Sequence, residues 1–159
     1  MHNIGIIPIL CIFFILEYLI LIFKTYNMEN LFLEYRSLYQ FDETVEKLTE
    51  IILSSGWKNP ATHDLQSTLA KNDIEVLPVK VIELCNPKIA ANILTDSDTR
   101  LYSSMLPCRI SVYDKADGKT YVSLMNAVEI AKQISGNAAE TLMIAFDESV
   151  KFIQTIVVK

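Results

Sequence analysis

Two cysteines at the ends of predicted elements are the residues of this sequence with the clearest chemical potential. Cys85 ends an apolar run and precedes Asn86-Pro87, whereas Cys108 opens a strand-like segment in Leu106-Pro107-Cys108. Asn86 fits a helix N-cap and Pro87 the first helical position, so Cys85 is expected just before a helix N-terminus. The unpaired N–H groups and the helix dipole at that point favour a thiolate, which makes Cys85 a candidate nucleophile.

The two cysteines also form a candidate pair. If the strand ending at Leu84 pairs antiparallel with the strand starting at Arg109, Cys85 and Cys108 come within reach of each other. A disulfide, a shared soft metal ion and a dithiol redox pair, in which Cys108 resolves Cys85, then all remain open. The alternative is structural, because free cysteine is among the most buried residue types and behaves as a small hydrophobe.

His63 and Asp64 are the further candidates for binding a ligand, together with Cys85, Asn86 and Cys108. The spacings typical of metal ligands, such as CxxC and HxxxH, are absent, so the sequence predicts no metal site. Asp64 also fits a helix N-cap. No phosphate-binding glycine loop or serine nucleophile motif is found, and no cofactor is implied.

The elements that would position these residues follow from the apolar pattern. The run Val76–Leu84 predicts a central strand, and a helix follows from Pro87 to about Leu94. Arg109–Asp114 and Lys119–Met125 alternate on either side of Asp117-Gly118, which predicts a hairpin. The polar segment between the helix and the hairpin, residues 95–104, is expected to be a loop.

The preceding region predicts a strand over Leu31–Tyr39 and a helix that Asp42 caps and Gly56 ends. An extended piece and a short helix, Asp64–Lys71, come next. Towards the C-terminus, a helix around Val128–Ile134 precedes a long helix from Ala138. Its regular stripe is expected to be a core face: Leu142, Phe146, Val150, Ile153 and Val157.

The N-terminal segment Ile4–Phe23 has the length and composition of a single membrane-spanning helix. Of its 20 residues, 17 are apolar, and Glu17 is the charged exception. No Lys or Arg precedes it and no small-residue cleavage site follows, so we expect an uncleaved anchor over residues 1–24 and a linker over 25–30. A buried core helix and a misassigned start codon are the alternatives.

Charge limits the partners and the orientation. The chain carries a net charge of −5 and no basic cluster, so nucleic acid is not an expected partner. Lys24 and Arg36 follow the predicted span and no Lys or Arg precedes it, which favours a cytoplasmic domain on two charges alone.

A series of short motifs in fixed order resembles the domain of unknown function 302 (DUF302) family, in the branch with cysteines in both motifs. The residues that carry the resemblance are Gly56-Trp57, Asp64, Cys85-Asn86-Pro87, Leu106-Pro107-Cys108-Arg109, Asp117-Gly118-Lys119 and Met125-Asn126. The resemblance covers about Leu31 to Val157 and implies an α+β fold of the TATA-binding-protein-like kind. In that fold, helices pack on one face of an antiparallel sheet. The resemblance implies no catalytic residues.

Two functions are therefore weighed for residues 31–159. The first is a membrane-tethered module, not an enzyme, that binds a small ligand or a protein through the sheet edge or a cleft near Cys85 and Cys108. The second is a thiol redox protein that uses the same two residues. Association into a homo-oligomer is compatible with either function, and the sequence identifies no ligand.

Overall fold

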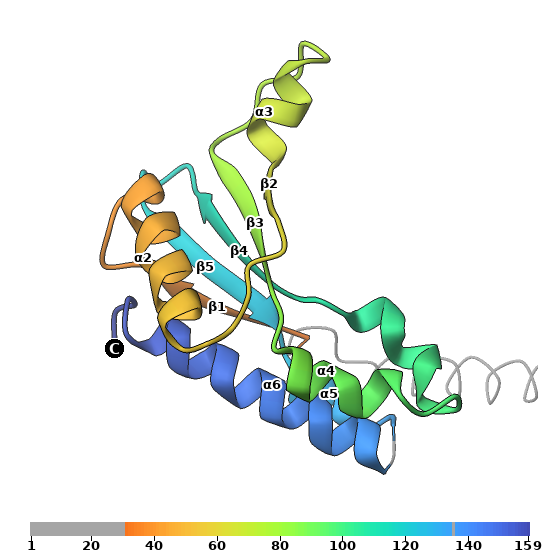
Figure 1. The fold of residues 1–159 in the computed structure, drawn as a ribbon. Helices are drawn as coiled ribbons and strands as arrows, with labels where there is room; N and C mark the ends of the chain where they lie inside the picture. Colours follow the sequence, from red (N-terminus) through yellow and green to blue (C-terminus); the bar gives the residue numbers. More distant parts are fainter. Residues whose placement is uncertain (1–30, 135) are drawn as a thin grey trace, which may run out of the picture. The chain divides into compact units, whose positions relative to one another are not determined.

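A five-stranded antiparallel sheet organises the described part of the chain, residues 31–134 and 136–159 of this computed structural model. The strands lie in the order β1-β5-β4-β3-β2, so the predicted hairpin, β4–β5, is internal (Figure 1). The strand bounds are β1 Phe32–Arg36, β2 Thr62–Asp64, β3 Val79–Leu84, β4 Cys108–Asp114 and β5 Thr120–Met125.

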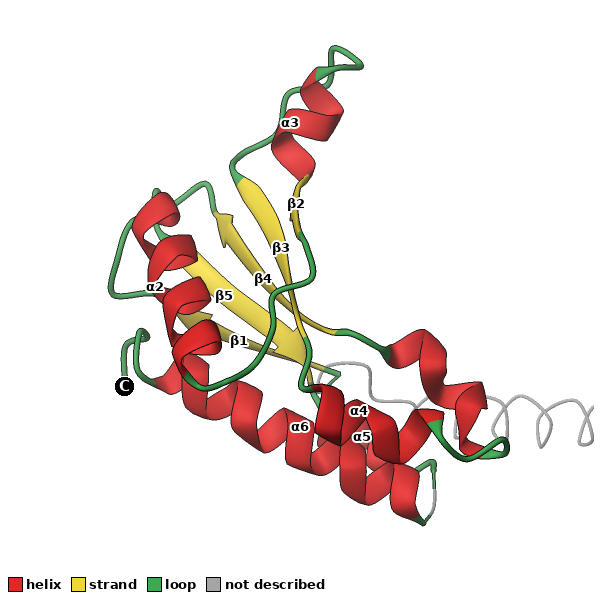
Figure 2. Ribbon diagram, viewed as in Figure 1, coloured by secondary structure: helices red, strands yellow, loops and turns green. Residues whose placement is uncertain are grey.

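Helices cover one face of this sheet (Figure 2). Helices α2 and α6 contribute buried side chains to the same core as the strands, whereas α3 lies on an arm beyond β2 (Figure 1). The predicted α+β class, with an antiparallel sheet and helices on one face, is therefore confirmed. The helix bounds are α2 Phe41–Ser54, α3 Leu65–Ala70, α4 Pro87–Leu94, the 3₁₀-helix η2 Thr99–Met105, α5 Ala127–Ala131 and α6 Asn137–Gln154.

The predicted anchor and linker, Ile4–Phe23 and residues 25–30, lie outside the described residues. Among the residues that the structure describes, no helix combines the length and apolarity needed to cross a bilayer.

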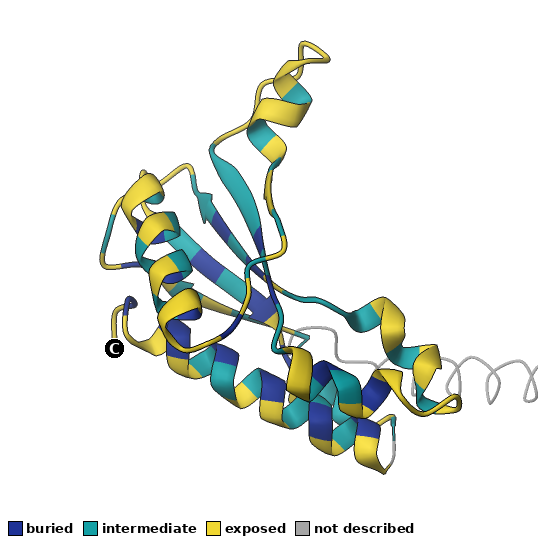
Figure 3. Ribbon diagram, in the orientation of Figure 1, coloured by how far each residue is buried: buried dark blue, intermediate teal, exposed yellow. Residues whose placement is uncertain are grey.

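Strand alternation gives the sheet an apolar face and a polar face. Successive side chains of a strand point to opposite faces, and one set from β3, β4 and β5 is buried beneath the helices (Figure 3). Its members are Ile82, Leu84, Ile110, Val112, Val122 and Leu124. The register places Glu83, Arg109, Ser111 and Ser123 on the opposite face.

Helix capping explains why two of the predicted helices begin where they do. The Asn86 side chain accepts a hydrogen bond from Lys88 N at 3.1 Å, and Pro87 occupies the first turn of α4. The Asp64 carboxylate accepts one from Ser67 N at 2.8 Å at the start of α3. Both caps are as predicted, because short polar side chains satisfy N–H groups that have no partner in the first turn.

Three local predictions are corrected. Helix α2 begins at Phe41 with Gln40 as its cap, so Asp42 lies inside the first turn and is not the N-cap. Its carboxylate is still well placed beside the positive end of the helix dipole. Strand β3 begins at Val79 and not at Val76. The expected loop over 95–104 contains most of η2, where i→i+3 hydrogen bonds order a polar segment.

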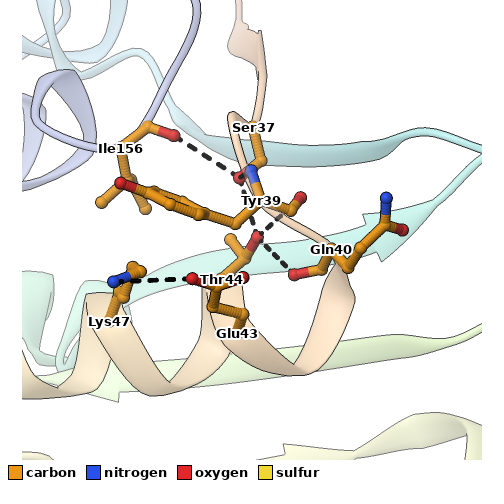
Figure 4. Close-up of polar contacts among 7 residues, drawn as sticks. All are labelled: Ser37, Tyr39, Gln40, Glu43, Thr44, Lys47 and Ile156. Carbon is orange, nitrogen blue, oxygen red and sulfur yellow. Dashed lines mark hydrogen bonds and ion pairs between the residues drawn. The ribbon is translucent and has the colours of Figure 1, made fainter.

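A buried hydroxyl pair joins the end of β1 to α2 (Figure 4). The Oγ of Ser37 lies 2.7 Å from Oγ1 of Thr44, which also donates to the Gln40 carbonyl at 2.8 Å. Ser37 donates to the Ile156 carbonyl and accepts from Tyr39 N. Because buried hydroxyls need partners, this network fixes a turn directly after β1. The strand therefore ends at Arg36 and not at the predicted Tyr39.

The predicted stripe of the C-terminal helix is only partly a core face, with Phe146 and Val150 packed against the edge of the core. Ile153 and Val157 are buried, but Leu142, Phe146 and Val150 are only half-buried. The buried residues of α6 are mostly small: Ala138, Thr141, Ala145, Ser149, Phe152 and Ile153. Helix α6 packs most extensively against α4 and α5, which small side chains on this face permit, and the larger apolar residues lie at the flank of the contact.

Candidate functional site

The two cysteines of the described chain lie side by side, as the predicted strand pairing requires. Cys108 is paired with Leu84, the residue before Cys85, in the β3–β4 register. Cys85 exchanges backbone hydrogen bonds with Lys58, at 2.8 and 2.9 Å. Both thiols are free, so the pair does not form a disulfide in this structure.

The space that the two cysteines share is almost completely filled. It measures about 10 Å³ and is also lined by Trp57, Asn86 and Ala145. Trp57 is 2% exposed and meets Phe152 edge to face, with 5.6 Å between ring centroids. Because even one water needs roughly 10–15 Å³, this space does not admit an organic ligand.

Burial raises the pKa of both thiols. The pKa of Cys85 lies above its ordinary value of 9.0, and desolvation together with the neighbouring Cys85 raises the pKa of Cys108 to about 11. This direction opposes the predicted thiolate at Cys85, because desolvation disfavours the charged form. A thiol nucleophile requires the thiolate, so the raised pKa values oppose activation of either residue near neutral pH.

A second, much larger cavity begins on the other side of Cys108. It has a volume of about 220 Å³. The pairing of β4 with β5 stops at Ile110 and Leu124, so the two strands separate towards Cys108 and Met125. Residues from both faces of the sheet line the cavity at this point, together with residues of η2, α5 and α6.

The walls of this cavity are mainly apolar. Three buried residues form the inner part: Leu124, Ala127 and Ser149. The Ser149 hydroxyl already donates a hydrogen bond to the Ala145 carbonyl, at 2.7 Å. Phe32 and Met125 are 62% and 48% exposed and mark the mouth. The remaining apolar lining residues are Met105, Pro107, Ile130, Leu142 and Phe146.

One charged side chain, Arg109, is among the described residues that line the cavity. Its Nη2 donates to Oε1 of Glu83 at 3.4 Å, and the same oxygen lies 3.1 Å from Nε2 of His63. The His63 hydrogen bond, followed by that of Arg109, lowers the pKa of Glu83 and keeps it ionised at neutral pH.

The other candidates from the sequence lie away from this cavity. His63 and Asp64, on β2, line neither space, and Asn86 lines only the small one. No group of three or more His, Cys, Asp or Glu that could hold a metal ion occurs within residues 31–134 and 136–159. Arg109 was missed, although it follows Cys108 in the motif and the alternation of the strand places it on the polar face.

Comparison with known proteins assigns the family. The sequence profile described as "Domain of unknown function DUF302" matches residues 33–155, which is most of the chain. The chain belongs to the DUF302 family. No curated protein matches it.

A solved structure of a DUF302 protein shares the fold. It is the crystal structure of an uncharacterized conserved protein DUF302 from Bacillus stearothermophilus. The TM-score is 0.70 at 19% identity, and the match covers 79% of this chain and 98% of the other.

Proposed function

We propose that this DUF302 domain is a binding module for a small, largely apolar molecule, held in the 220 Å³ cavity beside Cys108. The observation that carries the proposal is the cavity itself, apolar inside and bounded by exposed apolar side chains at its mouth. A dry apolar cavity of about 150 Å³ accommodates benzene, whereas drug-sized ligands need roughly 300 Å³ or more. The expected ligand is therefore slightly larger than a single ring.

The redox alternative has less physical support. Neighbouring thiols favour it, but the raised pKa of each cysteine opposes attack by either one near neutral pH.

The proposal also includes a tether. The apolar segment Ile4–Phe23 supports attachment of the domain to a membrane by a single span. Carbonate extraction of membranes from expressing cells tests this attachment. Retention of the full chain in the pellet is expected, and complete release would contradict the tether without bearing on the cavity.

Binding is tested with phenylacetamide, a small neutral aromatic probe, on the full chain in lipid nanodiscs. The chain has 5 methionines, and Met105 and Met125 line the cavity whereas Met143 does not. NMR of isotope-labelled methionine methyl groups should therefore show saturable shifts at Met105 and Met125 and none at Met143. Empty nanodiscs correct for partition of the probe into lipid.

A matched pair of variants assigns the binding to the cavity. Leu142→Trp places a larger side chain in the cavity wall and should abolish the shifts. Leu53→Trp makes the same change on α2, where Leu53 is 52% exposed and outside the cavity, and should leave them intact. Absence of saturable shifts in the unsubstituted chain, or shifts that survive Leu142→Trp, would contradict the proposed function.

A further inference from the structure

Arg109 is placed to contact a ligand at the mouth of the cavity. It lies on the helix-free face of β4, and its side chain is 53% exposed. Phe32 and Met125, the apolar residues of the mouth, lie on the same face by register. A molecule in the cavity would therefore have its apolar body against these residues and the inner wall, with one end beside the guanidinium.

The guanidinium group keeps most of its hydrogen-bonding capacity. Its hydrogen bond to Glu83 is long, at 3.4 Å, and uses Nη2. Within the described residues, its Nε and Nη1 have no protein acceptor. Glu83 is also shared with His63, which lies nearer, at 3.1 Å. Arg109 is therefore loosely held and able to donate a paired hydrogen bond to a planar oxyanion.

We propose that the ligand is a small amphipathic carboxylate, with its apolar body in the cavity and its carboxylate bound by Arg109. This inference rests on the proposed function and specifies the ligand class. A cationic ligand is opposed by Arg109, and a neutral ligand leaves the donors of that residue to water. The lining serines and the apolar wall carry no charge to compete with the carboxylate inside the cavity.

The test compares phenylacetate with phenylacetamide, which differ in charge and hardly in shape. In the methionine methyl titration of the full chain at neutral pH, phenylacetate should bind roughly three- to tenfold more tightly. Arg109→Gln should remove this preference while phenylacetamide still binds, because the exposed side chain contributes little to the fold.

Arg36→Gln is the matched control. Arg36 lies on the same helix-free face, on β1, but does not line the cavity. The preference for phenylacetate should survive this change, and it should weaken as salt is added. Equal affinity for the two probes, or a preference that persists in Arg109→Gln, would overturn the carboxylate inference. The binding of phenylacetamide would still support the cavity, so the two failures are distinguishable.

Discussion

Cys108 separates two spaces that differ about twentyfold in volume. On the side of β3 the space measures about 10 Å³, and on the side of β5 it measures about 220 Å³. Trp57 fills the first, in contact with Phe152. The second lies where β4 and β5 separate, and α6 contributes Leu142, Phe146 and Ser149 to its wall.

We expect the residues around the small space to stabilise the fold and those around the large cavity to be available for binding. The small space has the close packing of a protein interior, so substitutions there are expected to cost stability. The large cavity borders the same core, and substitutions of its lining residues are expected to cost less stability. The following predictions test this contrast.

The largest effect is expected for Trp57→Ala on the filled side. Loss of a fully buried indole should lower the free energy of unfolding by about 3–5 kcal/mol, through lost contacts and a new cavity. Urea unfolding followed by circular dichroism measures this change. A loss below about 1 kcal/mol would show that packing around Trp57 contributes little to the free energy of unfolding.

Phe146→Ala should cost less, because the Phe146 ring is half-buried and borders the large cavity. A loss within about 0.5–3 kcal/mol is expected, with a larger cavity as a by-product. The same unfolding measurement compares the two variants directly. If Phe146→Ala destabilises as much as Trp57→Ala, the proposed contrast between the two sides is wrong.

The thiols should respond slowly, and Cys108 more slowly than Cys85. Alkylation by iodoacetamide, followed peptide by peptide with mass spectrometry, should rise with pH to a midpoint above 9.0 for Cys85 and near 11 for Cys108. Since the unfolded Cys108 loses its proton first, stability should fall as pH rises from 9.0 towards 11. A midpoint for Cys85 below 9.0 would revive the redox alternative.

The smallest effect concerns Glu83, the partner of Arg109. The hydrogen bonds from His63 and Arg109 lower the pKa of Glu83 below its ordinary value of 4.5. The ionised side chain therefore stabilises the fold fully above pH 4.5, and this stabilisation is lost as the pH falls through the lowered pKa. Glu83→Gln should therefore cost about 1 kcal/mol or less near neutral pH and flatten the acid limb of the stability profile. An unchanged acid limb in this variant would exclude the ion pair as its cause.

Local signals explain why much of the fold was predictable. Asp117-Gly118 marks the β4–β5 turn, where Gly118 has a φ of 71°, and Asn86-Pro87 marks the start of α4. These signals act over a few residues, so the sequence contains them directly. The proximity of Cys85 and Cys108 followed from the same elements once the strands were paired.

The cavity and the thiol chemistry depend on longer-range packing. The orientation of α6 buries Ser149 and leaves Phe146 half-buried, whereas the apolar stripe alone predicts that Phe146 faces the core. The divergence of β4 from β5 has no sequence signal that we recognise. For Cys85, burial by the surrounding elements raises the pKa of the thiol, and burial is a property of the assembled core.

The most direct test of the binding site is magnetisation transfer between the phenylacetamide ring and individual methionine methyl groups of the full chain. A probe inside the 220 Å³ cavity should give cross-relaxation to the methyl groups of Met105 and Met125, which line it, and none to Met143. The same pattern should disappear in Leu142→Trp. Cross-relaxation to Met143 of equal strength, or none to any of the three while the probe is bound, would contradict the account.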